Sequence, residues 1–189
     1  MCIKERRGGV KTGKIEILMA GFGGQGIMLM GKLLAQAGLA SHKNVTWMPS
    51  YGAEVRGGTA YSMTKISDKE IANPIVTAPD ILVAMNEPSL VKYEERLKPK
   101  GLLILNKSLI KSKPKRKDLE VVSIPMTQIA LKLGSARSAN MVAMGALLKR
   151  SKLFPVRVVT GALREMLGGK EDLFILNKKV IEKGYNRAK

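Results

Sequence analysis

The stretch that decides the fold covers Lys14–Met30 and reads KIEILMAGFGGQGIMLM. An apolar run typical of a strand, Ile15–Ala20, leads into the pattern Gly21-x-Gly23-x-x-Gly26, and a second apolar run with helical character follows. A strand, a tight glycine turn and a helix in this order are typical of proteins that hold phosphates at a helix N-terminus or pack two backbones closely. The stretch therefore predicts an α/β fold with a candidate anion site near its start.

Each glycine of the turn has an expected role. We expect Gly21 to permit the sharp turn, Gly23 to let the main chain approach a ligand, and Gly26 to let the helix pack closely on the strand. Gly24 and Gln25 lie between them and complete the candidate binding turn.

Composition bounds the class of protein. With 189 residues, 45% of them hydrophobic, the chain is expected to form a single α/β domain over residues 14–189, preceded by a flexible basic tail over residues 1–13. No apolar run approaches the ~20 residues of a membrane helix, and the N-terminus lacks a signal-peptide pattern. We therefore expect a cytoplasmic protein without membrane contact.

The sequence carries few catalytic groups. Cys2 is the only cysteine and His42 the only histidine, which excludes an internal disulfide and a cysteine-ligated zinc or iron–sulfur site. No nucleophile pattern lies near His42, which we expect on the surface at a helix end. We expect no catalytic residue and no metal site in this chain.

The chain is strongly basic, with a net charge of +18 from 33 Lys+Arg against 15 Asp+Glu. Many of the cations crowd residues 98–117, around and between two expected strands. A basic nucleic-acid-binding module is one alternative, but the aromatic residues that stack on bases are missing between these cations. We favour a solvated surface for this segment.

The pattern of apolar residues predicts a three-layer α/β/α domain with a mostly parallel sheet, a Rossmann-like start and a helical C-terminal tail. The expected strands are 15–20, 44–48 (ending at Pro49), 60–66, 80–85, 101–105 and 120–124. The expected helices are 24–41, 87–97, 126–133, 139–150, 156–167 and 173–183.

Two nucleotide-binding readings of the glycine turn fail on neighbouring residues. A dinucleotide site needs an acidic residue at the end of the second strand, and 45–49 contains none. A P-loop reading of Gly26-x-x-x-x-Gly31-Lys32-Leu33 places Leu33 where a Ser or Thr should hold Mg²⁺. A stand-alone Rossmann-like nucleotide-binding oxidoreductase therefore remains only an alternative.

A second conspicuous segment is the loop that contains Glu54, Arg56, Gly57 and Gly58. A glycine pair beside an arginine and a glutamate indicates either an anion clamp or an ordered loop with an internal or subunit-facing ion pair, and both remain open. In a doubly wound domain this loop would leave the carboxyl end of the second strand, on the same side as the glycine turn. The two segments could then form one site.

The chain resembles the gamma subunit of the 2-oxoacid:ferredoxin oxidoreductases over roughly residues 14–185. The resemblance lies in GFGGQGI from Gly21, SYGAEVRGGT from Ser50, DILVAMN from Asp80 and NMVAMGAL from Asn140. The loop sequence is most similar to the 2-oxoglutarate and branched-chain 2-oxoacid types.

The resemblance implies a complex that oxidatively decarboxylates a 2-oxoacid, 2-oxoglutarate favoured, to its acyl-CoA and reduces ferredoxin. Thiamine diphosphate, Mg²⁺ and [4Fe-4S] clusters would belong to the complex, and alpha, beta and in some members delta subunits would be the partners. The gamma chain would serve assembly. Its residues for coenzyme A or inter-subunit contact would be Gly21, Gly23, Gly24, Gln25, Gly26, Glu54, Arg56, Gly57 and Gly58.

Overall fold

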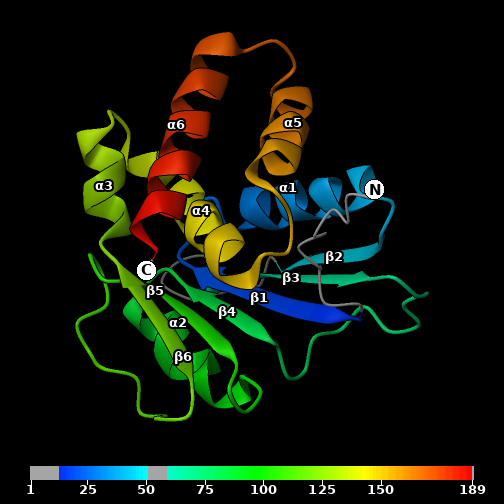
Figure 1. Cartoon of the computed structure of the whole chain (residues 1–189). Helices are drawn as coiled ribbons and strands as arrows, with labels where there is room; N and C mark the ends of the chain where they lie inside the picture. Colours follow the sequence, from blue (N-terminus) through cyan, green and yellow to red (C-terminus); the bar gives the residue numbers. More distant parts are fainter. Residues whose placement is uncertain (1–12, 51–58, 189) are drawn as a thin grey trace, which may run out of the picture.

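The computed structural model describes residues 13–50 and 59–188 (Figure 1). One six-stranded sheet forms the middle layer, with α1, α4, α5 and α6 on one face and α2 on the other. The three-layer α/β/α prediction is confirmed. The expectation of a basic tail over 1–13 and one domain over 14–189 stays a prediction, because residues 1–12 lie outside the described part.

The strands are β1 (Ile15–Gly21), β2 (Asn44–Ser50), β3 (Ala60–Ser67), β4 (Ile81–Ala84), β5 (Leu102–Asn106) and β6 (Glu120–Ile124). The helices are α1 (Ile27–Ala40), α2 (Glu87–Tyr93), α3 (Met126–Lys132), α4 (Ala139–Ser151), α5 (Val156–Leu167) and α6 (Glu171–Arg187), with short 3₁₀ turns η2 (Glu94–Arg96) and η3 (Ala136–Ser138).

The sheet order is β2-β3-β1-β4-β5-β6. Strands β1, β4, β5 and β6 are parallel, whereas β3 runs antiparallel to both β1 and β2. The mostly parallel sheet is confirmed. The insertion of β3 between β2 and β1 separates the first two strands, which are neighbours in a dinucleotide-binding unit.

Some expected boundaries were wrong for local reasons. The first helix begins at Ile27, not at residue 24, because Gly24 and Gly26 have φ of 84° and 71°, which a right-handed helix cannot accommodate. Strand β2 continues through Pro49, because it lies at the sheet edge and needs a hydrogen-bonded neighbour on one side only. The helix expected at 87–97 ends at Tyr93 and continues as a 3₁₀ turn.

The core has two parts, one on each face of the sheet. Ile17 and Met19 of β1 face the layer of α1 and α4, whereas Leu18 and Ala20 face the layer of α2. All four side chains are fully buried. This alternation along one strand is what a central strand of a sheet covered on both faces requires.

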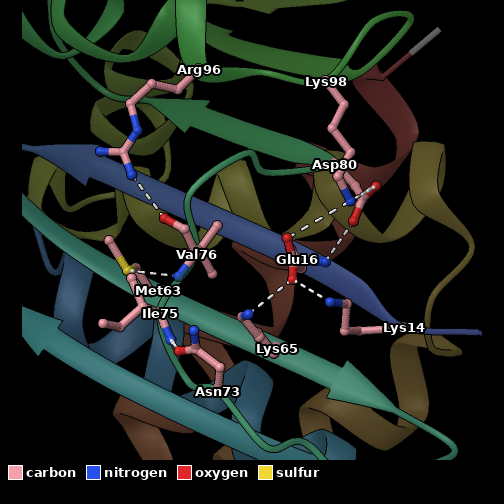
Figure 2. A network of polar contacts seen from close by, with 10 residues as sticks. All are labelled: Lys14, Glu16, Met63, Lys65, Asn73, Ile75, Val76, Asp80, Arg96 and Lys98. Atoms are coloured by element: carbon pink, nitrogen blue, oxygen red, sulfur yellow. Dashed lines mark hydrogen bonds and ion pairs between the residues drawn. The ribbon is translucent and has the colours of Figure 1, made fainter.

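An ion-pair cluster around a buried carboxylate lies at the start of β1, toward the α2 face (Figure 2). Glu16 is only 5% exposed, and its Oε1 lies 2.9 Å from Nζ of Lys65, its register partner on β3, and 2.8 Å from Nζ of Lys14. Its Oε2 lies 3.7 Å from Nζ of Lys98. Asp80 accepts hydrogen bonds from the Glu16 N–H and from Lys98 Nζ, both at 2.8 Å.

These cations determine the charge state of Glu16. Burial opposes ionisation of the carboxyl, but hydrogen bonds from Lys14 and Lys65, with the charges of Lys65 and Lys98, outweigh burial and hold the pKa of Glu16 below its ordinary value of 4.5. The same carboxylate raises the pKa of Lys14.

Helices α4 and α6 cross at two glycines. A Cβ on Gly145 would overlap the carbonyl oxygen of Ile181, and a Cβ on Gly184 would overlap that of Val142. This close approach lets α6 cover α4, whose residues Ala139–Leu148 are all buried.

The described helices include none long and apolar enough to cross a membrane. The cytoplasmic location stays a prediction.

We expect Gly145→Ala to lower the free energy of unfolding by about 1–3 kcal/mol, because the added methyl group must push two helix backbones apart. Urea unfolding followed by circular dichroism measures this change. The matched control is Gly161→Ala on α5, where no atom lies within 4 Å of the added Cβ. It should raise the stability by about 0.5–1 kcal/mol through helix propensity. Equal effects of the two changes would contradict the close crossing.

We expect Glu16→Gln to destabilise the protein by about 3–5 kcal/mol at neutral pH, because Lys65 would stay buried without its carboxylate. Lys14→Gln, on a side chain 50% exposed, should cost far less than Glu16→Gln, because solvent screens its ion pair. Urea unfolding at several pH values checks both.

The effect of Glu16→Gln should also depend on pH. Since the unfolded chain binds the Glu16 proton more tightly than the folded protein, the contribution of Glu16 is complete above the ordinary pKa of 4.5 and is lost as the pH falls through the lower folded-state pKa. The stability difference between wild type and Glu16→Gln should therefore shrink in acid. A difference that is constant with pH would contradict this account.

Candidate functional site

The glycine turn follows β1 at the carboxyl edge of the parallel strands. The side-chain Oε1 of Gln25 accepts a hydrogen bond from the Phe22 N–H at 2.7 Å, and the Gln25 N–H donates to the Phe22 carbonyl at 3.2 Å. Gln25 thus folds back and stabilises the turn with its amide oxygen. Phe22, Gly23 and Gly24 are exposed, so their backbone is accessible to a ligand.

Two glycines of the turn have roles that differ from the expectation. Gly21, not Gly26, permits the close approach of strand and helix, since a Cβ on Gly21 would lie 2.8 Å from Cδ1 of Ile27 and 2.9 Å from Cβ of Met85. Gly26 instead packs against α4. Its added Cβ would overlap the side-chain amide of Asn140, which donates to the Gly26 carbonyl at 3.2 Å.

The turn lies at the topological switch point of the sheet. Helix α1 follows β1 on one face, and α2 follows the neighbouring β4 on the other. Met85 and Asn86, directly after β4, lie next to the turn, with the Met85 N–H donating to the Ala20 carbonyl at 2.9 Å. In open α/β sheets this crevice is where ligands bind.

Asn86 and Asn140 support the site from two distant parts of the chain. Asn86 is 1% exposed, and its Oδ1 caps α2 by accepting from the Ser89 N–H at 2.9 Å. Its Nδ2 is buried with no hydrogen-bond partner among the described residues. The sequence analysis names Asn86 and Asn140 only within the segments DILVAMN and NMVAMGAL that carry the resemblance, and assigns neither a role in the site.

The electrostatics of the turn favour an anion. The first turn of α1 contains no acidic residue, and the first N–H groups of a helix have no acceptor within it. The partial positive charge at the helix N-terminus therefore faces the exposed backbone at Gly23 and Gly24 without a competing carboxylate on α1.

The loop with Glu54, Arg56, Gly57 and Gly58 lies outside the described residues. Its described flanks are informative, because Gly21 pairs with Ala60 and Ser50 pairs with Tyr61. Strand β2 therefore ends, and β3 begins, at the edge of the sheet that carries the glycine turn. That the two segments form one site stays a prediction.

The topology weakens the dinucleotide reading further. Strand β2 carries no acidic residue and is separated from β1 by β3, so no carboxylate of β2 can approach the turn in the manner of a ribose-binding site.

His42 is exposed directly after α1, as expected. Within 13–50 and 59–188, no three His, Cys, Asp or Glu side chains cluster as metal ligands would.

Most cations of the basic segment 98–117 are exposed, with two exceptions, whereas strand β5 within the segment is buried. That these cations face solvent stays a prediction. Lys98 belongs to the Glu16 cluster, and Arg116 donates to the carbonyls of Leu97 and Lys98, before β5, and to Asp118. The Arg116 hydrogen bond is the main reason that the pKa of Asp118 falls to about 2. The remaining lysines of the segment are exposed.

Residues 16–187 match the family model described as pyruvate ferredoxin/flavodoxin oxidoreductase. The ketoisovalerate oxidoreductase subunit VorA of Methanothermobacter marburgensis is 31% identical over 93% of this chain, which corresponds to 37% of that protein. The 2-oxoglutarate synthase subunit KorC of Methanocaldococcus jannaschii is 35% identical, and the match covers 92% of this chain and 94% of the relative.

Solved structures agree with these relatives. The keto/oxoacid ferredoxin oxidoreductase gamma subunit from Geobacter sulfurreducens has a TM-score of 0.80 and 28% identity, with 92% of this chain and 98% of that chain covered. The 2-oxoglutarate:ferredoxin oxidoreductase from Magnetococcus marinus, solved with 2-oxoglutarate, coenzyme A and succinyl-CoA bound, has a TM-score of 0.85 and 25% identity, with 94% of this chain and 31% of that chain covered.

The chain thus spans 37% of the length of VorA and nearly the whole of KorC. Its fold and its match over 16–187 confirm the resemblance that the glycine turn and the loop after Ser50 indicated. This chain belongs to the pyruvate ferredoxin/flavodoxin oxidoreductase family and is of the gamma-subunit type found in 2-oxoacid:ferredoxin oxidoreductases.

Proposed function

We propose that this chain is the subunit of a 2-oxoacid:ferredoxin oxidoreductase that contributes to the coenzyme A site and to assembly of the complex. The complex would oxidatively decarboxylate a 2-oxoacid to its acyl-CoA and pass the electrons to ferredoxin. Thiamine diphosphate, Mg²⁺ and the [4Fe-4S] clusters would be held by alpha and beta subunits, with a delta subunit in some complexes.

The observation that carries the coenzyme A proposal is the glycine turn at the switch point. Coenzyme A presents several phosphates, and the turn offers exposed backbone at Gly23 and Gly24 beside the N-terminus of a 14-residue helix. Because glycine has no side chain, a phosphate can approach the main chain at both positions. The relative from Magnetococcus marinus was solved with coenzyme A bound, which supports a ligand of this class for the complex.

The choice of 2-oxoglutarate rests on relatives of matching length. KorC, a 2-oxoglutarate synthase subunit, is 35% identical and covered over 94% of its length. VorA, a ketoisovalerate oxidoreductase subunit, is 31% identical and covered over 37%. We therefore favour 2-oxoglutarate over a branched-chain 2-oxoacid.

The assembly proposal rests on apolar side chains that the described part of the chain leaves exposed near the turn. Phe22 in the turn is 39% exposed and Leu29 on the first turns of α1 is 40% exposed. Large apolar side chains at the mouth of a crevice are suited to burial by a partner subunit.

We expect Gly24→Asp to raise the KM for coenzyme A of the assembled complex about tenfold relative to Gly24→Asn. Both residues tolerate the left-handed backbone at position 24, where φ is 84° and nothing lies within 4 Å of the added Cβ. Only the aspartate adds a negative charge beside the phosphates. Steady-state kinetics with varied coenzyme A measure the difference.

The KM for the 2-oxoacid is the internal control and should be equal in the two variants. Arg56→Ala should also raise the KM for coenzyme A. Equal coenzyme A constants for Gly24→Asp and Gly24→Asn, with an unchanged value in Arg56→Ala and normal assembly, would overturn the proposed coenzyme A contact.

Affinity purification of the tagged chain at native expression should yield a brown complex. The partners should contain thiamine diphosphate and show iron–sulfur absorbance, and the preparation should reduce ferredoxin with 2-oxoglutarate faster than with 2-oxoisovalerate. A colourless homo-oligomer with bound NAD would contradict the proposal. A brown complex that prefers 2-oxoisovalerate would overturn the substrate choice alone.

A further inference from the structure

Two cavities of the described structure have basic rims, and they differ in how their charge is balanced. The first, of about 740 Å³, lies at the amino edge of the parallel strands, where Ile15, Ile81 and Leu102 begin β1, β4 and β5. The second, of about 630 Å³, lies at the carboxyl end of β6, between α3 and the last turns of α6. Both volumes are in the range of small-molecule sites.

Four of the six cations that line the first cavity form ion pairs, and only Lys100 and Lys152 form none among the described residues. Its rim includes three carboxylates, each with a cationic partner that also lines the cavity. The pairs are Lys43 with Asp68, Lys98 with Asp80, and Arg150 with Glu120.

The cations of the second cavity have no such partners. It is lined by Lys132 of α3 and by Lys183 and Arg187 of α6, and no acidic residue is among its described lining. None of the three side chains forms an ion pair within residues 13–50 and 59–188, and all three residues are exposed. We call this cavity the α3–α6 groove.

The three cations of the α3–α6 groove repel one another, so their closeness does not stabilise the fold. Lys183 and Arg187 are four residues apart on one helix, where like charges repel and destabilise the helix. Lys132 adds a third positive charge to the same groove from another helix. An anion in the groove would remove this repulsion.

The remaining lining defines the class of anion. Gln128 and Asn186 supply amide donors, and Ser123 supplies a hydroxyl. Ile124, Ile129 and Leu133 give the groove an apolar side. Cations, neutral donors and an apolar wall in one concave site suit a small organic phosphate better than a flat protein surface.

We propose that the α3–α6 groove binds a small phosphate-bearing molecule with at least two negative charges, through Lys132, Lys183 and Arg187. The site is distinct from the glycine turn, because the groove is at β6 and the sheet places β4 and β5 between β6 and β1. It does not depend on the proposed coenzyme A contact.

The test is a titration of the ¹⁵N-labelled full chain with inorganic pyrophosphate at low salt, followed by NMR. We expect saturable shifts at amides of residues 123–133 and 183–187, which weaken as salt is raised. Lys183→Gln/Arg187→Gln should lower the affinity at least about tenfold. The matched control, Lys100→Gln/Lys152→Gln, removes the same charge from the rim of the first cavity and should leave the affinity nearly unchanged.

Further variants separate this proposal from its rivals. Lys132→Gln tests the groove from α3 and should weaken binding even if the double variant on α6 fails to fold. Gly24→Asp should leave the groove shifts intact, whatever becomes of the coenzyme A contact. Equal loss of affinity in both double variants, shifts confined to residues 22–27, or binding of poly-glutamate without binding of pyrophosphate would each overturn the proposal.

Discussion

Strand β1 is hydrogen-bonded on both sides, and this double ladder is the interaction on which the rest of the fold depends. It pairs antiparallel with β3 over Ile15–Gly21 and parallel with β4 over Ile17–Ala20. Its four central side chains alternate between the two core clusters and are fully buried. Burial on this scale stabilises each large side chain by roughly 1.5–3 kcal/mol, so a polar group is tolerated only at the ends of the strand. One end carries the paired Glu16, and the other carries the glycine turn.

The sequence predicted where strands and helices lie along the chain better than which of them lie side by side. Local patterns determine strands and helices, whereas tertiary contacts determine their packing. The alternation and the apolar runs identified all six strands within a few residues. Nothing local in 44–67 indicates that β3 lies between β2 and β1, since that placement depends on ladder partners far along the chain. The same holds for Gly26. Its need for glycine could be read from the pattern, but its neighbour Asn140 lies 114 residues away.

The sequence also does not indicate which of the many basic residues form ion pairs in the fold. A sequence count places Lys98 and Arg116 in one basic segment with their exposed neighbours. The fold turns these two inward, one to Glu16 and Asp80 and the other to Asp118 and loop carbonyls. In contrast, Lys132 and Lys183 come from separate helices and share one groove without a carboxylate among its described lining. Net charge therefore does not indicate where an anion can bind, because ion pairing within the fold decides which cations remain available.

The two edges of the sheet consequently differ in what they can do. At the amino edge, the carboxylates of Asp68, Asp80 and Glu120 line the cavity and pair with Lys43, Lys98 and Arg150, while Lys100 and Lys152 form no ion pair among the described residues. At the carboxyl edge, α1 begins without an acidic residue in its first turn, and the groove beside β6 has unpaired cations in its described lining. A bound anion at the carboxyl edge would gain interactions that no carboxylate of the described chain already uses. An anion at the amino edge would compete with three carboxylates for the paired cations. Because carboxylates compete with an anion at the amino edge and not in the described lining at the carboxyl edge, we expect the ligands of this subunit at the carboxyl edge.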